Sequence, residues 1–290
     1  MAGIIDLIGN TPLVKLSRLN TNPEVEIYAK LEGNNPGGSV KDRAALNMIR
    51  SAIELGEIKP GTKLIEATSG NTGIALAMIA SLYNLEIELV MPSNSTKERT
   101  LTMEAFGARV TLLDNIEVCR DYADEKGATE GYYLLNQFAN PNNYLAHYKT
   151  TGPEIWRDTA GKITHFVSAM GTTGTIMGCS KFLKEQNAAV QIVGCQPTED
   201  ASIPGIRRWP KAYLPKIFDP KRVDRIIDIS ETNAIQTARQ LAKVEGIFAG
   251  TSSGGACYAA LKLAAELSSG VIVFIACDRG DRYLSSNLFG

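Results

Sequence analysis

Histidine and cysteine, the residues on which many protein metal sites depend, are scarce in this sequence. Its 290 residues include two histidines, His147 and His165, and five cysteines that lie far apart without any C-x-x-C pair. Such spacing argues against a zinc site and a disulfide framework, so we predict no bound metal. A serine–histidine triad is also disfavoured, although a single histidine would suffice for one. Any chemistry is therefore expected to rest on other side chains or on a cofactor.

Long apolar runs and an excess of one charge are missing as well. The longest apolar runs, such as GVIVFIAC at 270–277, are far too short to span a bilayer. The N-terminal MAGIIDLIGN lacks the basic region of a signal peptide and carries Asp6 in its apolar stretch. The 30 lysines and arginines nearly balance the 31 aspartates and glutamates. The chain thus lacks the excess of positive charge that binds nucleic acid or an anionic membrane. We therefore expect a cytoplasmic protein with no nucleic-acid or membrane partner.

Strand-like and helix-like segments alternate along most of the chain. Strands are predicted at 62–67, 86–92, 109–114, 164–170, 191–197 and 271–277, and helices at 73–84, 97–107, 174–186 and 254–267. Apolar strands spaced by helices indicate parallel sheets covered on both faces, and hence an α/β fold. The segment 136–151 is polar and loop-like, and we interpret it as the boundary between two α/β lobes. In such folds ligands bind beyond the carboxyl ends of the strands.

The segment 34–49, NNPGGSVKDRAALNMI, places a lysine one turn into a predicted helix, on its core-facing side. Ser39 is the predicted N-cap and Asp42 completes a capping-box pattern. Apolar residues recur at helical spacing from Ala45 onward, and counting back one turn reaches Lys41. Burial and the positive end of the helix dipole both lower the pKa of an amine, which suits Schiff-base chemistry. The alternative is a lysine that reaches the surface and has no function.

Three strand-to-helix turns combine glycines with hydroxyl or amide side chains. ATSGNTG at 67–73 contains no lysine or arginine, which suits a carboxylate or a similarly small anion held by neutral dipoles. MGTTGTIMG at 170–178 could surround a phosphate, but it matches neither the Walker loop nor G-x-G-x-x-G, so a nucleotide is disfavoured. AGTSSGG at 249–255 is the weakest of the three signals. Each turn could also be an ordinary turn without a ligand.

A stiff, cationic and aromatic loop follows in SIPGIRRWP at 202–210. Its adjacent Arg207 and Arg208 suit an oxyanion such as a carboxylate or a sulfate-like group. The alternative is a surface or dimer contact, since arginine and tryptophan are also enriched in interfaces.

Taken together, these motifs resemble the pyridoxal-phosphate enzymes of the tryptophan-synthase-β-like fold, and within it the cysteine synthases, or O-acetylserine sulfhydrylases. The resemblance covers essentially the whole chain, and SIPGIRRW and CDRGDRYLS are similar to the B-type members of that family. The matching segments, in order, are IGNTPLVKL (8–16), NNPGGSVKDRAA (34–45), EATSGNTGIALA (66–77), GTTGT (171–175), GIFAGTSSGGA (246–256) and DRGDRYLS (278–285).

The resemblance implies two lobes, each a mostly parallel twisted sheet with helices on both faces, with the cofactor in the cleft between them. The smaller, mobile lobe would comprise 37–143 and carry the substrate carboxylate loop. The larger lobe would comprise 1–36 and 144–290 and carry the cofactor phosphate site. A homodimer is also implied.

The resemblance further implies roles for individual residues. Lys41 matches the lysine that binds pyridoxal 5'-phosphate as a Schiff base, and Ser252 matches a serine that contacts the cofactor. Ser252, Cys277 or Asp278 would meet the pyridine nitrogen, and the sequence leaves these three open. Cofactor-phosphate contacts are implied for Gly171, Thr172, Thr173, Gly174 and Thr175. Substrate-carboxylate contacts are implied for Thr68, Ser69, Gly70, Asn71, Thr72 and Gln137, with Asn71 also near the cofactor 3'-oxygen.

The implied reaction is a β-replacement in cysteine biosynthesis, in which O-acetyl-L-serine and sulfide give L-cysteine and acetate, with Lys41 as general base. Because sulfide alone does not need two guanidiniums, Arg207 and Arg208 lead us to expect thiosulfate use as well, giving S-sulfocysteine. The preferred sulfur donor and any binding of serine acetyltransferase stay open. The alternatives are a serine or threonine dehydratase, a racemase, a cystathionine β-synthase core, or a non-catalytic regulatory binding partner.

Overall fold

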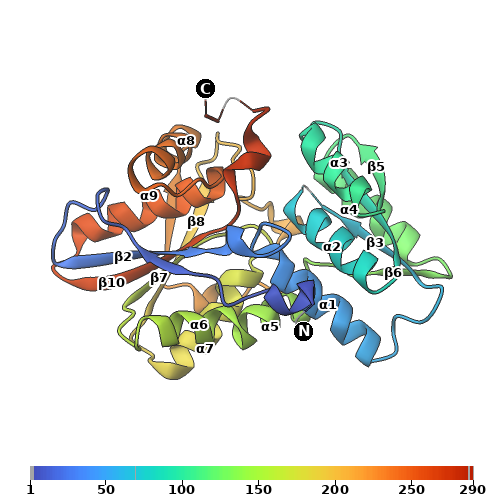
Figure 1. Cartoon of the computed structure of the whole chain (residues 1–290), viewed down its shortest axis with the longest axis horizontal. Helices are drawn as coiled ribbons and strands as arrows, with labels where there is room; N and C mark the ends of the chain where they lie inside the picture. The colour runs from blue at the N-terminus through green and yellow to red at the C-terminus, as the bar shows by residue number, and fades with distance from the viewer. Residues whose placement is uncertain (1–2, 69, 287, 290) are drawn as a thin grey trace.

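Two sheets lie side by side in the computed structural model, which describes residues 3–68, 70–286 and 288–289 (Figure 1). The larger sheet has the strand order β1-β2-β10-β7-β8-β9, and the smaller has the order β5-β4-β3-β6. All neighbouring strands are parallel except β1 and β2. The strands are β1 Leu13–Lys15, β2 Val25–Leu31, β3 Lys63–Ala67, β4 Glu86–Pro92, β5 Arg109–Leu113, β6 Tyr132–Leu134, β7 His165–Ala169, β8 Gln191–Pro197, β9 Arg225–Ile229 and β10 Gly270–Ala276. The mostly parallel α/β fold expected from the sequence is therefore confirmed.

Helices cover both faces of each sheet. They are α1 Lys41–Glu54, α2 Asn71–Leu82, α3 Lys97–Ala105, α4 Ile116–Gly127, α5 Pro141–Lys149, α6 Thr151–Asp158, α7 Gly174–Gln186, α8 Glu231–Gln240 and α9 Thr251–Glu266. Short 3-10 turns occupy Ile4–Leu7, Glu32–Asn34, Lys211–Tyr213, Pro220–Arg222 and Gly280–Tyr283, and a π turn spans Leu241–Glu245. These helices, turns and strands make up the secondary structure of the residues that the structure describes.

The apolar strands alternate their side chains between two core layers, which explains their continuous apolar runs. In β3, Leu64 packs with α1 and α2, whereas its neighbour Ile65 packs with α4. In β10, Phe274 packs with α9, whereas Ile275 packs with α7. Burial on both faces leaves these strands no polar side, as the sequence pattern indicated.

The prediction that 136–151 is a loop is wrong, because most of it forms α5. The Asn140 side chain caps this helix by accepting the backbone N–H of Asn142 at 2.9 Å, and Pro141 occupies its first turn. One face of α5 buries Asn143, Ala146 and His147, and the side chains of Asn143 and His147 contact the segment 172–175. Its polar composition therefore reflects side chains that pack and hydrogen-bond, not a linker.

The predicted capping box at the start of α1 is also wrong. The helix begins at Lys41, after an N-cap at Val40 that makes no side-chain cap. Ser39 Oγ accepts the Lys41 backbone N–H at 3.2 Å, but the Asp42 carboxylate accepts the backbone N–H of Gly37. The carboxylate thus ties down the turn that precedes the lysine.

The smaller sheet lies wholly within 63–134, inside the segment expected to form the smaller lobe. The lobe limits of 37–143, and the mobility of that lobe, stay predictions. Among the described residues, no helix combines the length and the apolar character that crossing a membrane requires.

Candidate active site

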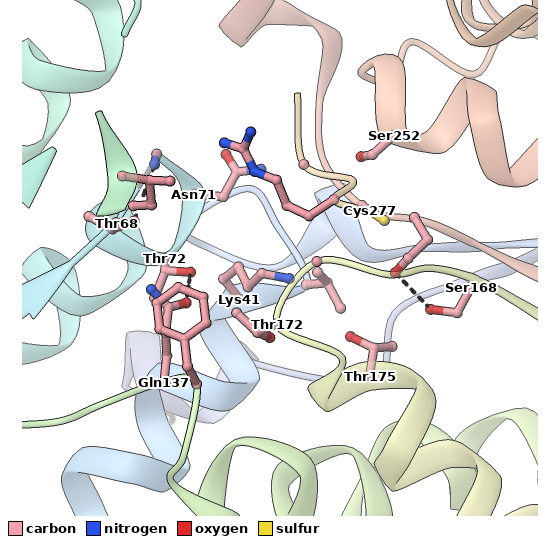
Figure 2. A pocket seen from close by; sticks show the side chains of 18 of the residues that line it. Lys41, Thr68, Asn71, Thr72, Gln137, Ser168, Thr172, Thr175, Ser252 and Cys277 are labelled. Carbon is pink, nitrogen blue, oxygen red and sulfur yellow. Dashed lines mark hydrogen bonds between the residues drawn. The ribbon is translucent and has the colours of Figure 1, made fainter. Parts of the chain in front are cut away.

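A cavity lies between the two sheets at the carboxyl ends of β3, β7 and β10 (Figure 2). It encloses about 810 Å³ of space free of atoms, its open mouth included. The predicted site residues that line it are Lys41, Thr68, Gly70, Asn71, Thr72, Gln137, Gly171, Thr172, Thr175, Arg207, Ser252 and Cys277. Segments far apart in the sequence therefore meet here as the motif order suggested. Ser69 lies outside the described residues.

Lys41 enters the cavity from the first turn of α1 (Figure 2). Backbone contacts hold the loop before it against the end of β10. Val40 N–H donates to the Cys277 carbonyl at 2.8 Å, and Ser39 forms an isolated β-bridge with Asp278. Burial lowers the pKa of the Lys41 amine, against the opposing charges of Cys277, Asp278 and Glu32. Its amine makes no hydrogen bond or ion pair with any residue that the structure describes. The site thus holds an amine biased toward its neutral, nucleophilic form.

A buried ion network anchors α1 two residues after this lysine. Arg43 pairs with Glu32 and with Glu154, each at 2.7 Å, and Lys30 joins Glu154 at 2.8 Å. Burial alone would raise the pKa of Glu154, but hydrogen bonds and charge from Arg43 and Lys30 lower it to about 2. All four side chains are buried, so the network fixes α1 against β2 and α6.

The turn after β3 folds around hydroxyl groups. Thr68 Oγ1 accepts the backbone N–H groups of Gly70 and Gly73 at 3.2 and 3.1 Å. Thr72 Oγ1 donates to Gln137 Oε1 at 2.8 Å, and Gln137 Nε2 donates to the Ala67 carbonyl at 2.7 Å. Gln137, distant in sequence, is thereby fixed beside the start of α2. Gly73 N–H and Ile74 N–H already have partners, so among the described residues the N–H groups of Asn71 and Thr72 are the ones left for an anion at the start of this helix.

The turn after β7 is a second place for an anion. Thr173 has a left-handed backbone (φ 69°) at the N-cap of α7, and its buried hydroxyl has no hydrogen-bond partner within the described chain. A side chain at Gly174 would collide with Asn143, whose amide donates to Thr172 Oγ1 at 3.1 Å. No basic side chain belongs to the turn, so its dipoles alone would hold a phosphate.

Thr175 also lines the cavity, and its hydroxyl contacts His147. His147 Nε2 lies 3.4 Å from Thr175 Oγ1, and His147 Nδ1 lies 2.9 Å from Thr151 Oγ1. Burial lowers the pKa of His147 to about 3, so the ring is neutral at physiological pH. The turn therefore gains a polar neighbour but no positive charge from it.

Of the three candidates for the pyridine nitrogen, Ser252 and Cys277 line the cavity. Burial raises the pKa of the Cys277 thiol to about 11, which keeps it neutral. The Asp278 carboxylate is buried and accepts hydrogen bonds from Asn71 Nδ2 at 2.6 Å, the Tyr283 hydroxyl at 2.7 Å and Gly250 N–H at 3.2 Å. Both of its oxygens are already engaged, so the geometry favours Ser252 or Cys277.

The two predicted arginines separate in the structure. Arg207 lines the cavity and, among the described residues, makes no hydrogen bond or ion pair through its side chain. Arg208 instead donates to the Pro197 carbonyl at 2.8 Å and pairs with Asp228 at 2.7 Å. It does not line the cavity, because these two partners hold its guanidinium elsewhere. The expectation that both arginines meet the substrate is corrected to Arg207 alone.

Sequence reasoning missed several cavity residues. The Trp209 indole N–H donates to the Gly171 carbonyl at 2.7 Å, and its ring packs on Phe138 with centroids 5.4 Å apart. Tyr283 and Arg99 line the cavity beside the start of α2. Trp209 and Tyr283 lie in segments noted as motifs, but composition alone does not tell which of their side chains turn inward.

Comparisons with known proteins agree with this arrangement. The family described as pyridoxal-phosphate dependent enzyme matches residues 4–278. Cysteine synthase B of Pseudomonas aeruginosa is 57% identical over 289 residues, covering 99% of this chain and 97% of that protein. Cysteine synthase B of Escherichia coli is 56% identical over 293 residues, covering 100% and 97%. The crystal structure of a hydrogen sulfide-producing enzyme from Fusobacterium nucleatum superposes with a TM-score of 0.93 at 38% identity, covering 98% and 100%.

Proposed function

Because the chain belongs to the family of pyridoxal-phosphate dependent enzymes, we propose that it is a cysteine synthase of the B type. It converts O-acetyl-L-serine and sulfide into L-cysteine and acetate, a step of cysteine biosynthesis. The observation that carries the proposal is the Lys41 amine of lowered pKa in a cavity flanked by two turns that suit anions. The reaction needs one amine, one phosphate site and one carboxylate site, and this cavity offers all three.

The residues fit the cofactor. Lys41 is the amine for its aldehyde, the turn 171–175 with the unpartnered Thr173 hydroxyl suits its phosphate, and Ser252 or Cys277 suits its ring nitrogen. When bound, pyridoxal phosphate supplies an electron sink for the charge that develops at the substrate Cα.

Lys41 carries out the proton transfers. It takes the proton from the substrate Cα as general base and returns it once the sulfur has joined Cβ. The bond from Cβ to the acetate oxygen breaks, and a bond from Cβ to sulfur forms. Burial lowers the pKa of this amine and so favours the neutral form that can accept a proton.

The other side chains orient the substrate and limit side reactions. The turn 68–72 and Gln137 hold the α-carboxylate, and closure of the smaller lobe over it would exclude water. Ser252 and Cys277 are neutral, so neither holds a proton on the ring nitrogen as an aspartate would. This weaker support for the carbanion disfavours racemisation and transamination and leaves exchange at Cβ.

Arg207 extends the range of sulfur donors to thiosulfate, which would give S-sulfocysteine. An unpaired guanidinium at the cavity wall is costly unless an anion meets it. Burial lowers its pKa, opposed by the charge of Glu117, and the group stays a cation at neutral pH. We further propose a cytoplasmic homodimer, with no membrane or nucleic-acid partner.

Replacement of the lysine tests the proposal. Lys41→Ala should abolish both cysteine formation and the absorbance near ~410 nm that the cofactor gives when joined to an amine. A variant that makes product at the wild-type rate would refute the role of Lys41. Analysis of products from O-acetylserine plus sulfide separates a synthase from a dehydratase or racemase, and a protein that never takes up pyridoxal phosphate would favour a binding module.

A further inference from the structure

The segment 277–283 contacts three of the segments that line the cavity. The Cys277 carbonyl accepts Val40 N–H at 2.8 Å, next to Lys41. The Asp278 carboxylate accepts Gly250 N–H at 3.2 Å and Asn71 Nδ2 at 2.6 Å. This segment therefore links the loop 37–40 before Lys41, called the lysine loop below, to the start of α2 and the start of α9.

The amide of Asn71 is held from both ends by this segment. Its Nδ2 donates to Asp278 Oδ2, and its Oδ1 accepts from Arg282 Nη1 at 2.6 Å. Arg282 also donates to the Gly37 carbonyl, so the guanidinium spans the lysine loop and α2. The Tyr283 hydroxyl donates to the same Asp278 oxygen at 2.7 Å, which fixes the carboxylate in turn.

These contacts permit one orientation of the amide. If it were turned over, its oxygen would face the Asp278 carboxylate and its NH₂ group would face the Arg282 guanidinium, and both contacts would be repulsive. In the orientation observed, one of the two N–H bonds of Nδ2 is used, and the other has no partner among the residues that the structure describes. Asn71 lines the cavity beside Thr72, across from Cys277 (Figure 2). An anionic oxygen bound in the cavity would find a donor at this position.

We propose that Asp278 and Arg282 are positioning residues that hold the Asn71 amide with a free N–H for an anionic oxygen. This inference rests on the proposed function, which supplies two such oxygens: the cofactor ring oxygen and the substrate carboxylate. Arg282 is partly buried between the two loops, whereas Arg279 in the same segment is exposed and pairs with Asp281 at 3.0 Å. The two arginines therefore form a matched pair for an experiment.

A double-mutant cycle between Asn71→Ala and Arg282→Met tests whether Arg282 acts through Asn71. One arm titrates the apoprotein with pyridoxal phosphate, and the other titrates the holoenzyme with L-serine, each followed by absorbance. The amide binds an oxygen of one of these two ligands. Asn71→Ala should weaken the binding of that ligand about tenfold, because a hydrogen bond to a charged group is lost. Arg282→Met should weaken the same arm about tenfold, and the double variant should be no weaker than either single variant.

Several results would overturn the inference. Independent action of the two residues would multiply their effects to about a hundredfold in the double variant. An Arg282→Met protein that binds both ligands like wild type, or an Asn71→Ala protein that does so, would equally refute it. Arg279→Ala, the control, should change neither affinity by more than about twofold.

Folding and function are checked separately. If Arg282→Met does not fold, as judged by its circular dichroism melt, Asp278→Asn takes its place in the cycle with the same expectations. Rescue of binding by Arg282→Lys would support the inference, because lysine restores a donor to Asn71 Oδ1. A wild-type protein that binds pyridoxal phosphate but forms no cysteine would refute the proposed function while leaving the cofactor arm of the cycle readable.

Discussion

Arg207 and Arg208 are neighbours in the sequence, yet their surroundings give them different chemistry. Arg208 meets a carbonyl and the Asp228 carboxylate, so its charge is compensated within the protein. Arg207 lines the cavity without such a partner among the described residues. Its charge is therefore available to a ligand.

Replacing each arginine with alanine separates these roles. Arg207→Ala should lower kcat/KM with thiosulfate about tenfold or more, because a charge-assisted hydrogen bond is lost, and should change kcat/KM with sulfide less than about twofold. Arg208→Ala is the control and should leave both ratios near wild type. Equal losses for the two sulfur donors in Arg207→Ala would contradict the proposed thiosulfate site.

Residue types and their spacing in the sequence single out Lys41, Arg207 and the glycine- and hydroxyl-rich turns, whereas Gln137 and Cys277 follow only from the family resemblance. Lys41 stands out because an amine on the buried face of a helix start is unusual, and the hydroxyl-rich turns stand out because free N–H groups attract anions. The direction of each arginine does not follow from the sequence, since it depends on tertiary partners such as Asp228. Tyr283 escapes prediction for the same reason, because its partner is set by the fold.

At the scale of elements, α5 and α7 pack closely enough that a glycine is needed between them. A side chain at Gly178 of α7 would collide with the Tyr144 carbonyl and with the Cβ of His147, both in α5. The close approach also brings His147 to Thr175 at the start of α7. Helix α5, which the sequence did not reveal, therefore supports the turn at 171–175.

Gly178→Ala should lower the free energy of unfolding by about 1–3 kcal/mol, because an added methyl group must push α5 and α7 apart. Urea titration of the apoprotein measures this, and the same variant should need more pyridoxal phosphate for half-saturation. Gln186→Ala, an exposed change on the same helix, should stay within about 0.5 kcal/mol of wild type. An unchanged Gly178→Ala midpoint would show that the two helices separate without cost.

The strands were predictable, whereas α5 was not, and the reason is physical. Strands buried on both faces carry mostly apolar side chains, and this pattern predicts β4 and β8 with their observed limits, Glu86–Pro92 and Gln191–Pro197. Helix α5 buries an asparagine and a histidine, which find polar partners in Thr172 and Thr151, so no apolar stripe marks it. Its cap, Asn140 followed by Pro141, was the readable signal.

At the scale of the whole molecule, buried acids make stability depend on pH. Burial raises the pKa of Glu66 from 4.5 to about 8 and that of Asp42 from 3.8 to about 7. The folded state then binds more protons than the unfolded state between those values, so stability falls as the pH rises through that window. Glu154, with its pKa lowered to about 2, acts oppositely: its contribution is present above pH 4.5 and is lost as the pH falls toward 2.

The free energy of unfolding should therefore be about 1–3 kcal/mol lower at pH 8 than at pH 6. Urea titrations of the apoprotein at the two pH values measure the difference. Glu66→Gln keeps the shape of the side chain but cannot ionise, so it should reduce this difference. If the Glu66→Gln protein kept the full wild-type pH dependence, Glu66 would not be the cause of the lower stability at pH 8.

The late strand β10 lies between β2 and β7, and this position affects how the chain folds during its translation (Figure 1). On the ribosome, the hairpin of β1 and β2 cannot join β7, β8 and β9 in one sheet until Gly270–Ala276 has been translated. The smaller sheet is continuous in the sequence, so the nascent chain can complete it earlier. Lys41 emerges early but gains Cys277 and Asp278 only when that late strand docks. Cofactor capture is therefore expected to follow translation, as one of the closing events of folding.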